Sequence, residues 1–577
     1  MVLAMRLNSP TSTGPGPSKL LDSLRRLLDA GRGRSHAPGW SFTSGLVLAV
    51  IALPVAAVLY LAATARDNDW PHLASAVLPV ALQQTLLLAL GTVAVTLVAG
   101  TSTAWLITMY RFPGRAVLDR LLVLPLAIPT YIAAYCYSEI FDYAGPVQSE
   151  LRSLFGWTTA QDYWFPNIRS LPGAVLVMSA VLYPYVYLAA RATFVQQSVC
   201  ALEVARTLGR TSMGTFWAVA LPLARPALAA GAALVAMETL NDLGAVQHLG
   251  IQTLSASIYA TWLQRSNLGG AAQLATVTLL LIVLLLAAER YARGGAKVHH
   301  TTGRYRAIPF QDIDGWRGYA AAALCALPFV VGFVVPFLLL ARFAMAHVSV
   351  AIEGGFLSAA WNSLMLATLA AGAAVALGLL ISYAPRVAKT RFTRVAAQMS
   401  GFGYALPGAV LALGVLIPLA AIDNSVDALV RDFLGLSTGL ILSGSIAALV
   451  YAYVIRFLAV ARGGIEAGLE RISPNLDAAA RALGETAASA LWRIHLPLLL
   501  PALGAAGLLV FVDALKELPT TLLLRPFNFE TLATHVYAFA AVEQVEAGAL
   551  GALTIVLAGL VPLVVLHRAI AGRTGNG

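Results

Sequence analysis

Apolar stretches of about the length of a membrane span recur along the whole chain, and they restrict its possible folds more than any other feature. A helix needs roughly 20 residues to cross the hydrocarbon core of a bilayer. Charged residues make up 11% of this chain, where soluble domains carry about 25%. The sequence therefore predicts an all-α integral membrane protein with about twelve transmembrane helices. The stretches lie near residues 44–64, 82–109, 120–140, 173–193, 226–246, 271–289, 319–341, 362–383, 398–420, 439–461, 498–519 and 547–567.

Basic residues are distributed unevenly over the connections between these stretches. If the amino terminus lies in the cytoplasm, 30 of the 38 Lys and Arg residues fall on the cytoplasmic side, with Arg456 counted among them. Short cytoplasmic loops of membrane proteins carry such an excess. An even number of crossings returns the chain to its starting side, so we expect both termini in the cytoplasm. The net charge of +10 follows from this topology and indicates no nucleic-acid partner.

The second half of the chain repeats the first. The segment TLGRTSMGTFWAVALPLARPAL at 207–228 returns as ALGETAASALWRIHLPLLLPAL at 482–503, an offset of 275 residues. Further matches at an offset of 278 residues link Thr85, Gly100 and Pro129 to Ser363, Gly378 and Pro407. We predict a cytoplasmic tail with a short amphipathic helix (1–43), a first repeat (44–289), a basic cytoplasmic linker (290–318) and a second repeat (319–577). Parallel six-helix repeats of this kind are related by a pseudo-two-fold axis along the membrane normal.

Each repeat carries one short patterned loop on the predicted cytoplasmic side. Its glycine allows a sharp turn between two short helices, and its alanine lets the first helix approach a partner closely. Its proline suits the first turn of the next membrane helix, where a missing N–H matters least. In the second loop the acid stands one position early, which rotates it by about 100° around a helix. The residues are Glu203, Ala205, Gly209, Leu221 and Pro222 in the first loop, and Asp477, Ala480, Gly484, Leu496 and Pro497 in the second.

These loops resemble the EAA loop of bacterial ABC-importer permeases. In that family the loop is a cytoplasmic helix-turn-helix that inserts into a groove of an ATPase, so the resemblance implies a coupling role for the residues above. The chain has no G-x-x-x-x-G-K-[ST] phosphate-binding loop. The resemblance therefore implies that ATP with Mg²⁺ is hydrolysed on a separate subunit, one copy for each loop. We expect a transport subunit that is not an enzyme and binds no cofactor of its own.

Four carboxylates follow the two loops at matching positions, Glu238 with Asp513 and Asp242 with Glu517. Acids within a bilayer are costly and usually functional. The spacing of four residues predicts that each pair shares one helix face, in the outward-facing third of the membrane. Together the four acids could form an oxygen-rich vestibule for a hard cation. The alternative is that they cap helix ends or pair with Lys516 and Arg525.

Aromatic residues also gather near the predicted outer half of the membrane. They fit an interfacial belt: Tyr131, Tyr135, Tyr137, Tyr183, Tyr185 and Tyr187.

The segments 237–262 and 516–537 resemble the fused permeases of ferric-iron ABC importers. This resemblance implies a bacterial inner-membrane permease that receives Fe(III) from a periplasmic binding protein and works by alternating access with two ATPase subunits. A fused permease for thiamine, a polyamine or a phosphonate is the first alternative. The second is an ion-driven secondary transporter, because twelve helices in two parallel halves also describe that class; the paired loops argue against it.

Overall fold

The protein is described here by a computed structural model that covers residues 38–65, 69–196, 207–293, 310–353 and 355–574. Nearly all of these residues are helical, and eleven helices are long and apolar enough to cross a membrane, or up to twelve if one bent pair counts as a span. The prediction of an all-α multi-pass membrane protein is confirmed. The amphipathic helix predicted within the tail and the loop residues Glu203 and Ala205 lie outside the described residues.

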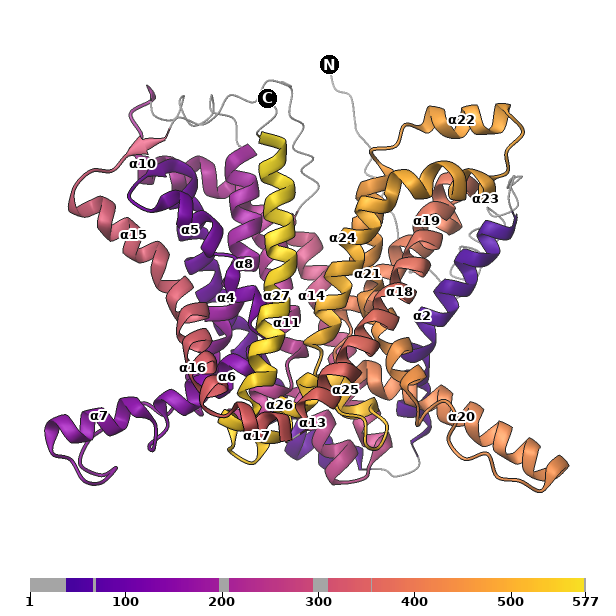
Figure 1. Cartoon of the computed structure of the whole chain (residues 1–577), viewed down its shortest axis with the longest axis horizontal. Helices are drawn as coiled ribbons and strands as arrows, with labels where there is room; N and C mark the ends of the chain where they lie inside the picture. The colour runs from indigo at the N-terminus through magenta and orange to yellow at the C-terminus, as the bar shows by residue number, and fades with distance from the viewer. Residues whose placement is uncertain (1–37, 66–68, 197–206, 294–309, 354, 575–577) are drawn as a thin grey trace, which may run out of the picture.

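Figure 1 shows the helices of both halves. In the first half they are α2 (Pro38–Thr64), α3 (Trp70–His72), α4 (Leu78–Met109), α5 (Arg115–Leu121), α6 (Thr130–Phe141), α7 (Pro146–Phe155), α8 (Leu171–Gln196), α10 (Ser212–Thr215), α11 (Leu221–Asn241), α12 (Gly244–His248), α13 (Leu254–Tyr259) and α14 (Leu268–Arg293). In the second half they are α15 (Trp316–Phe329), α16 (Val335–Ala346), α17 (Val348–Glu353), α18 (Phe356–Ala388), α19 (Arg391–Met399), α20 (Gly408–Leu434), α21 (Ile446–Leu469), α22 (Pro474–Ala482), α23 (Ala487–Ala490), α24 (Leu496–Leu515), α25 (Pro519–Leu524), α26 (Leu532–Ala541) and α27 (Val545–Thr574).

One predicted span in each half has a different shape in the structure. The stretch near 120–140 is not one helix, because the helical segments Arg115–Ala127 and Thr130–Phe155 meet at an angle of 94°. Between them Pro129 has an extended backbone, and a proline disfavours helix in the residue before it. Pro407 has the same conformation, so the predicted span 398–420 is also wrong at its start: α20 begins only at Gly408.

Four of the long helices contain a π turn that ends two residues before a proline. The turns are Leu73–Val77, Phe216–Ala220, Val330–Val334 and Leu491–His495, and the prolines are Pro79, Pro222, Pro336 and Pro497. Proline lacks an N–H and crowds the carbonyl four residues earlier, and a wider turn relieves that crowding. Pro222 and Pro497 thus begin α11 and α24 as predicted, but within continuous helical spans, Ser212–Asn241 and Ala487–Leu515.

The first helix of each repeat packs against the other repeat. Helix α2 of the first repeat lies along α18, α19 and α20 of the second, and α16 of the second repeat contacts α6 of the first as well as α27 of its own repeat. The backbones approach so closely that only glycine fits at two positions: a Cβ on Gly414 would lie 2.4 Å from the Pro54 oxygen, and one on Gly332 would lie 2.0 Å from the Ala180 oxygen. The two halves are therefore interlocked.

A short parallel sheet attaches the end of the linker to the first repeat. Strand β1 (Tyr110–Arg111) pairs with β2 (Gln311–Asp312). The Arg115 guanidinium lies 3.9 Å from the centre of the Phe310 ring. This part of the linker is therefore anchored beside the end of α4, which the sequence analysis did not predict.

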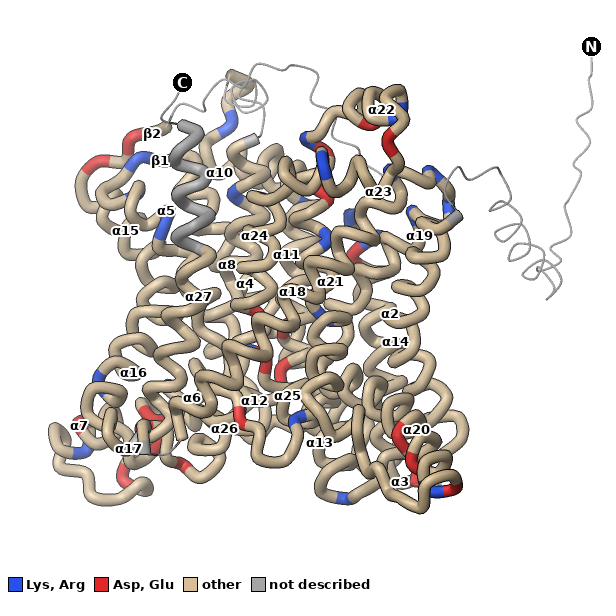
Figure 2. Tube along the Cα trace, turned by 45° about the vertical axis from the view of Figure 1, so that its right-hand side comes forward, with Lys and Arg blue, Asp and Glu red and all other residues tan. Residues whose placement is uncertain are grey.

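The two ends of the bundle are distinct. Figure 1 shows α10, α22 and α23 at one end, which also holds the end of α27, whereas α7, α13, α17 and α26 lie at the other. Below, these are called the α22 end and the α7 end. Charged residues gather at both ends and also in one interior group near α12 and α25 (Figure 2).

Candidate functional site

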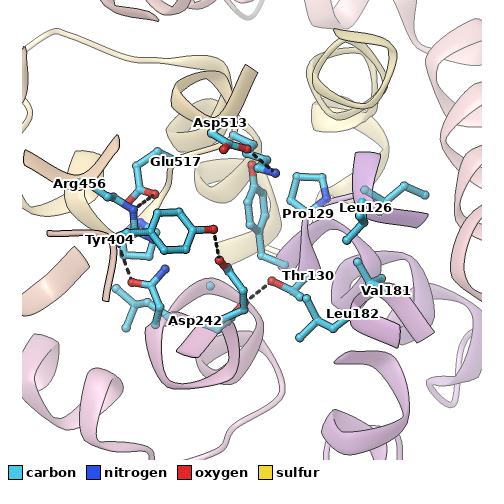
Figure 3. Close-up of a pocket in the computed structure, with 18 of the residues that line it drawn as sticks. Leu126, Pro129, Thr130, Val181, Leu182, Asp242, Tyr404, Arg456, Asp513 and Glu517 are labelled. Carbon is cyan, nitrogen blue, oxygen red and sulfur yellow. Dashed lines mark hydrogen bonds and ion pairs between the residues drawn. The ribbon is translucent and has the colours of Figure 1, made fainter. Parts of the chain in front are cut away.

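A cavity deep in the bundle lies where the two halves meet. Its volume is about 90 Å³, which is room for several water molecules. The structure brings all four of the predicted carboxylates together on its wall: Glu238 and Asp242 from the first half, and Asp513 and Glu517 from the second. We call this space the acid cavity (Figure 3).

The two acids of each pair do not share a helix face, so the prediction that they stack is wrong. Helix α11 ends at Asn241, and Asp242 follows it with an extended backbone. The Asp242 carboxylate accepts a 2.8 Å hydrogen bond from the Ala245 N–H and so caps α12. Glu517 likewise follows α24 and accepts a 3.1 Å bond from the Thr520 N–H. A side chain that competes for backbone N–H groups favours such caps, which agrees with the alternative drawn from the sequence.

Both bases that line the acid cavity come from the second half. The Arg456 Nε atom lies 3.0 Å from a Glu517 oxygen, and these side chains are only 5% and 6% exposed. The contact is close, but its angle falls outside hydrogen-bond geometry, so we treat it as an ion pair. The Lys516 Nζ atom lies 2.9 Å from an Asp513 oxygen. The residue that matches Arg456 at an offset of 275 in the first half is Val181.

Three hydrogen bonds close the acid cavity across the two halves. The Tyr404 hydroxyl donates to Glu238 at 2.8 Å. The Asn241 side-chain oxygen accepts from Arg456 at 2.9 Å and from the Gly408 N–H at 2.7 Å. Each of these bonds joins a first-half residue to a second-half residue, so separation of the halves at this level would break all three.

The charge of the acid cavity is not symmetric. Asp513 and Glu517 each have a basic partner, but among the described residues neither Glu238 nor Asp242 forms an ion pair. Asp242 instead accepts a hydrogen bond from the Thr130 hydroxyl. With four acids against two bases, the cavity carries a negative charge when all are ionised, and that charge lies on the first-half wall. In the described part of the chain no three His, Cys, Asp or Glu residues are placed to hold a metal ion together.

The sequence analysis missed several of the residues that complete this site. It assigned Arg456 to the cytoplasmic side, whereas the structure places it in the acid cavity. An arginine inside an apolar stretch is costly, and that signal could have found it. The suggested partner Arg525 is wrong, because it pairs with Glu530. The predicted interfacial belt is also wrong for most of its tyrosines, because five of the six are buried within the chain: Tyr131, Tyr135, Tyr137, Tyr183 and Tyr187.

The two patterned loops both turn at their glycine. Gly209 and Gly484 have φ of +82° and +79°, a left-handed conformation that glycine adopts without strain. Directly before these glycines, Leu208 and Leu483 are 78% and 83% exposed. Both repeats therefore present a large apolar side chain at the same position of the turn. We call the segments 207–222 and 474–497 the coupling hairpins.

The acid of the second coupling hairpin points into the chain. The Asp477 carboxylate accepts a 2.7 Å bond from Arg386 and lies 2.7 Å from His495 Nε2. Burial opposes its ionisation, but the hydrogen bonds from Arg386 and His495 outweigh burial and lower the pKa of Asp477. Ala480 is only 3% exposed, so its small side chain packs inside the chain. In the first half Thr108 and Ala220 stand at the positions that match Arg386 and His495.

Comparisons with known proteins agree with this architecture. Residues 96–293 match the family described as "Binding-protein-dependent transport system inner membrane component". The Fe(3+)-transport system permease protein FbpB 2 of Haemophilus influenzae is 25% identical over 473 residues, which cover 81% of this chain and 86% of that protein. The sulfate transport system permease protein CysT of Salmonella typhimurium is 28% identical over 44% of this chain and 92% of its own length. The molybdenum transport system permease protein ModB of Escherichia coli is 29% identical over 34% of this chain and 84% of its own length.

These relatives are transport permeases of the ABC type and are not enzymes. The resemblance to fused ferric-iron permeases is confirmed by similarity along most of the chain. Other substrates are also represented among the relatives, sulfate and molybdenum among them.

Proposed function

We propose that this chain, a multi-pass permease of the binding-protein-dependent ABC type, is the membrane subunit of an ATP-driven importer whose cargo is Fe(III). In this proposal a periplasmic binding protein delivers Fe(III) to the α7 end. Two copies of an ABC ATPase bind the coupling hairpins and hydrolyse ATP with Mg²⁺. The α22 end and both termini then face the cytoplasm of a bacterial cell, as the distribution of basic residues predicts.

The charge of the acid cavity is the observation that carries the choice of cargo. Fe(III) is a hard cation and prefers carboxylate and other oxygen ligands. The cavity offers four carboxylates, and among the described residues neither Glu238 nor Asp242 forms an ion pair with a base. An excess of acids repels an anion such as sulfate, so the charge of this wall favours a cation as cargo. We therefore assign Glu238, Asp242, Asp513 and Glu517 to the substrate pathway.

The oxygens of the acid cavity are already engaged with groups of the chain itself. A transport site has to bind its cargo well enough to admit it and weakly enough to release it. Caps, ion pairs and cross-half hydrogen bonds already use the cavity's oxygens. Rocking of the two halves would break the Tyr404–Glu238 and Arg456–Asn241 bonds and expose these oxygens. ATP-driven movement of the coupling hairpins supplies the force for this step.

The coupling hairpins support the proposed ATPase contact at both repeats. Their exposed Leu208 and Leu483 lie at the turns, where an apolar side chain can insert into a groove of the ATPase. In the second hairpin Asp477 is engaged with Arg386, so its contact with the ATPase depends on the apolar tip. The proposed docking residues are Glu203, Ala205, Gly209, Leu221 and Pro222 in the first repeat, and Gly484, Leu496 and Pro497 in the second. Asp477 and Ala480 were expected to dock as well, but both side chains contact their own chain.

Uptake of radioactive iron into proteoliposomes tests the cargo. The permease is reconstituted with its ATPase and the iron-loaded binding protein, and the variants E238Q and D242N are compared with D432N, which changes an exposed acid outside the cavity. We expect at least about tenfold slower uptake for the cavity variants, with the ATPase still bound, and unchanged uptake for D432N. Uptake at the wild-type rate in E238Q and D242N would contradict the proposed pathway.

Co-purification with the ATPase tests the hairpins. We expect L208S and L483S each to weaken ATPase binding, and the double variant to abolish co-purification, because each hairpin loses its exposed apolar contact. The control L436S changes a leucine that is 63% exposed and follows α20, a helix that Figure 1 shows extending outward at the α7 end. If the double variant binds ATPase as well as the wild type, the hairpins are not the docking site.

A further inference from the structure

One face of α6 carries polar groups that have no partner. Tyr131, Tyr135 and Ser138 follow one another at intervals of four and three residues, so they share a face of the helix. Their side chains are 4%, 1% and 1% exposed, yet none of the three hydroxyls has a hydrogen-bond partner in the described part of the chain. The buried Nε2 atom of His248, on α12, also lacks one. Below, the polar face of α6 means these four residues, three on α6 itself and His248 on the adjacent α12.

The four groups are close to one another. The Tyr131 and Tyr135 ring centres are 5.8 Å apart, and the Tyr135 and His248 ring centres are 4.7 Å apart. Helix α12 can approach α6 because residue 244 is glycine: a Cβ there would lie 2.8 Å from the Tyr131 Cβ. Buried polar groups are nearly always hydrogen-bonded, so several unpaired groups together indicate a ligand or water that occupies the site in another state of the protein.

Other polar groups of the same helix are paired. The Tyr137 hydroxyl donates to the Val331 carbonyl, and the Thr130 hydroxyl donates to Asp242. Partners are therefore available around α6, and among the buried polar side-chain atoms of this helix in the described residues only the hydroxyls of Tyr131, Tyr135 and Ser138 lack them.

The second repeat shows that the fold does not require this polar face. At an offset of 278, Tyr131, Tyr135 and Ser138 correspond to Ala409, Leu413 and Leu416 on α20. At an offset of 275, His248 corresponds to Leu523. The same architecture is thus built with apolar residues in one repeat and with unpaired polar residues in the other. The polar version belongs to the repeat whose cavity acids lack ion-pair partners.

The polar face leads from the α7 end of the bundle to the acid cavity. Helix α6 starts at Thr130, which lines the cavity together with Tyr131. It ends at Phe141, close to the start of α7 at the far end of the bundle (Figure 1). We infer that Tyr131, Tyr135, Ser138 and His248 form a one-sided entry path, on the first repeat only, along which a hard cation passes from the α7 end to Glu238 and Asp242.

The chemistry of the path fits such a cargo. Phenol and hydroxyl oxygens and the lone pair of a neutral imidazole are ligands for a hard cation or for its bound water. Each site offers few donors, so the ion is not held firmly at any of them. The inference rests on the proposed import function for the direction of movement and for the identity of the cargo.

Removal of the phenol hydroxyls tests the path. In the iron-uptake assay we expect the Y131F/Y135F variant to be at least about tenfold slower than the wild type. Its melting temperature should be unchanged or higher, because it loses only unpaired buried groups. The control Y137F removes a paired hydroxyl of the same helix and should lower the melting temperature while uptake continues. Wild-type uptake by Y131F/Y135F would overturn the inference.

A labelling experiment separates the path from the identity of the cargo. Ser138→Cys is introduced into a chain whose three native cysteines are replaced by alanine, and a water-soluble thiol reagent is added from the periplasmic side of the reconstituted complex. We expect modification during ATP turnover, and slower modification when Fe(III)-loaded binding protein is present. No modification in any state would overturn the path. Modification without iron uptake by the wild type would instead contradict the proposed function and retain the path as a route for water.

Discussion

Replacement of Arg456 by glutamine should destabilise the protein more than any exposed charge change. Arg456 forms the ion pair with Glu517 and donates hydrogen bonds to Asn241 at 2.9 Å and to the Leu406 carbonyl at 3.3 Å. Its loss leaves Glu517 unpaired and 6% exposed. Removal of one partner of a buried ion pair costs about 3–5 kcal/mol, so we expect a loss of this size in the free energy of unfolding of R456Q.

A double-mutant cycle isolates the pair. In R456Q/E517Q both charges are gone, and the remaining penalty is that of the lost hydrogen bonds, about 0.5–1.5 kcal/mol each. The double variant should therefore be more stable than R456Q alone, with a coupling energy of about 1–3 kcal/mol. The free energy of unfolding is measured in detergent by denaturant titration. The control is R462Q, whose partner Glu466 is 51% exposed, and it should change stability by about 0.5 kcal/mol or less.

Two results would refute this reasoning. If R456Q loses less than about 1 kcal/mol, water or a rearranged neighbour already compensates Glu517. If R456Q/E517Q is no more stable than R456Q, the ion pair contributes nothing to the free energy of unfolding.

Two further predictions test the packing at the cavity and the second coupling hairpin. G244A places a Cβ 2.6 Å from Leu518 Cδ2, so we expect overpacking to lower the free energy of unfolding by about 1–3 kcal/mol. In the control G372A the added Cβ meets nothing within 4 Å, and stability should be unchanged or higher. Thermal unfolding of the two variants compares them. D477N removes the negative charge that pairs with Arg386 and should cost about 1 kcal/mol at pH 7. Because the folded state lowers the pKa of Asp477 below 3.8, this contribution is present above that value and disappears as the pH falls through the lower folded pKa. The wild type and D477N should therefore converge in stability at acid pH, and a difference that persists there would contradict the assignment.

The sequence alone determined the class of the protein and its duplication. Apolar length, charge content and identities at a fixed offset are properties of the chain itself, and they need no knowledge of what packs against what. The coupling hairpins belong to this group, because glycine at 209 and 484 is needed for a local left-handed turn. The four cavity acids could be selected in the same way, from their cost in a membrane and their matched positions.

The tertiary structure alone decided what surrounds those acids. Helix α11 ends at Asn241 because Asp242 caps the next helix, and such competition between a side chain and the helix is not visible in the apolar pattern. Arg456 was counted among the cytoplasmic residues, although it lies in the acid cavity, because its partner Glu517 is distant in sequence. The polar face of α6 also depends on tertiary structure. Helix α12 packs against α6, and no described residue supplies the three hydroxyls with a hydrogen-bond partner. Local patterns fix where a chain crosses the membrane, whereas charge balance in a cavity is set by residues that only folding brings together.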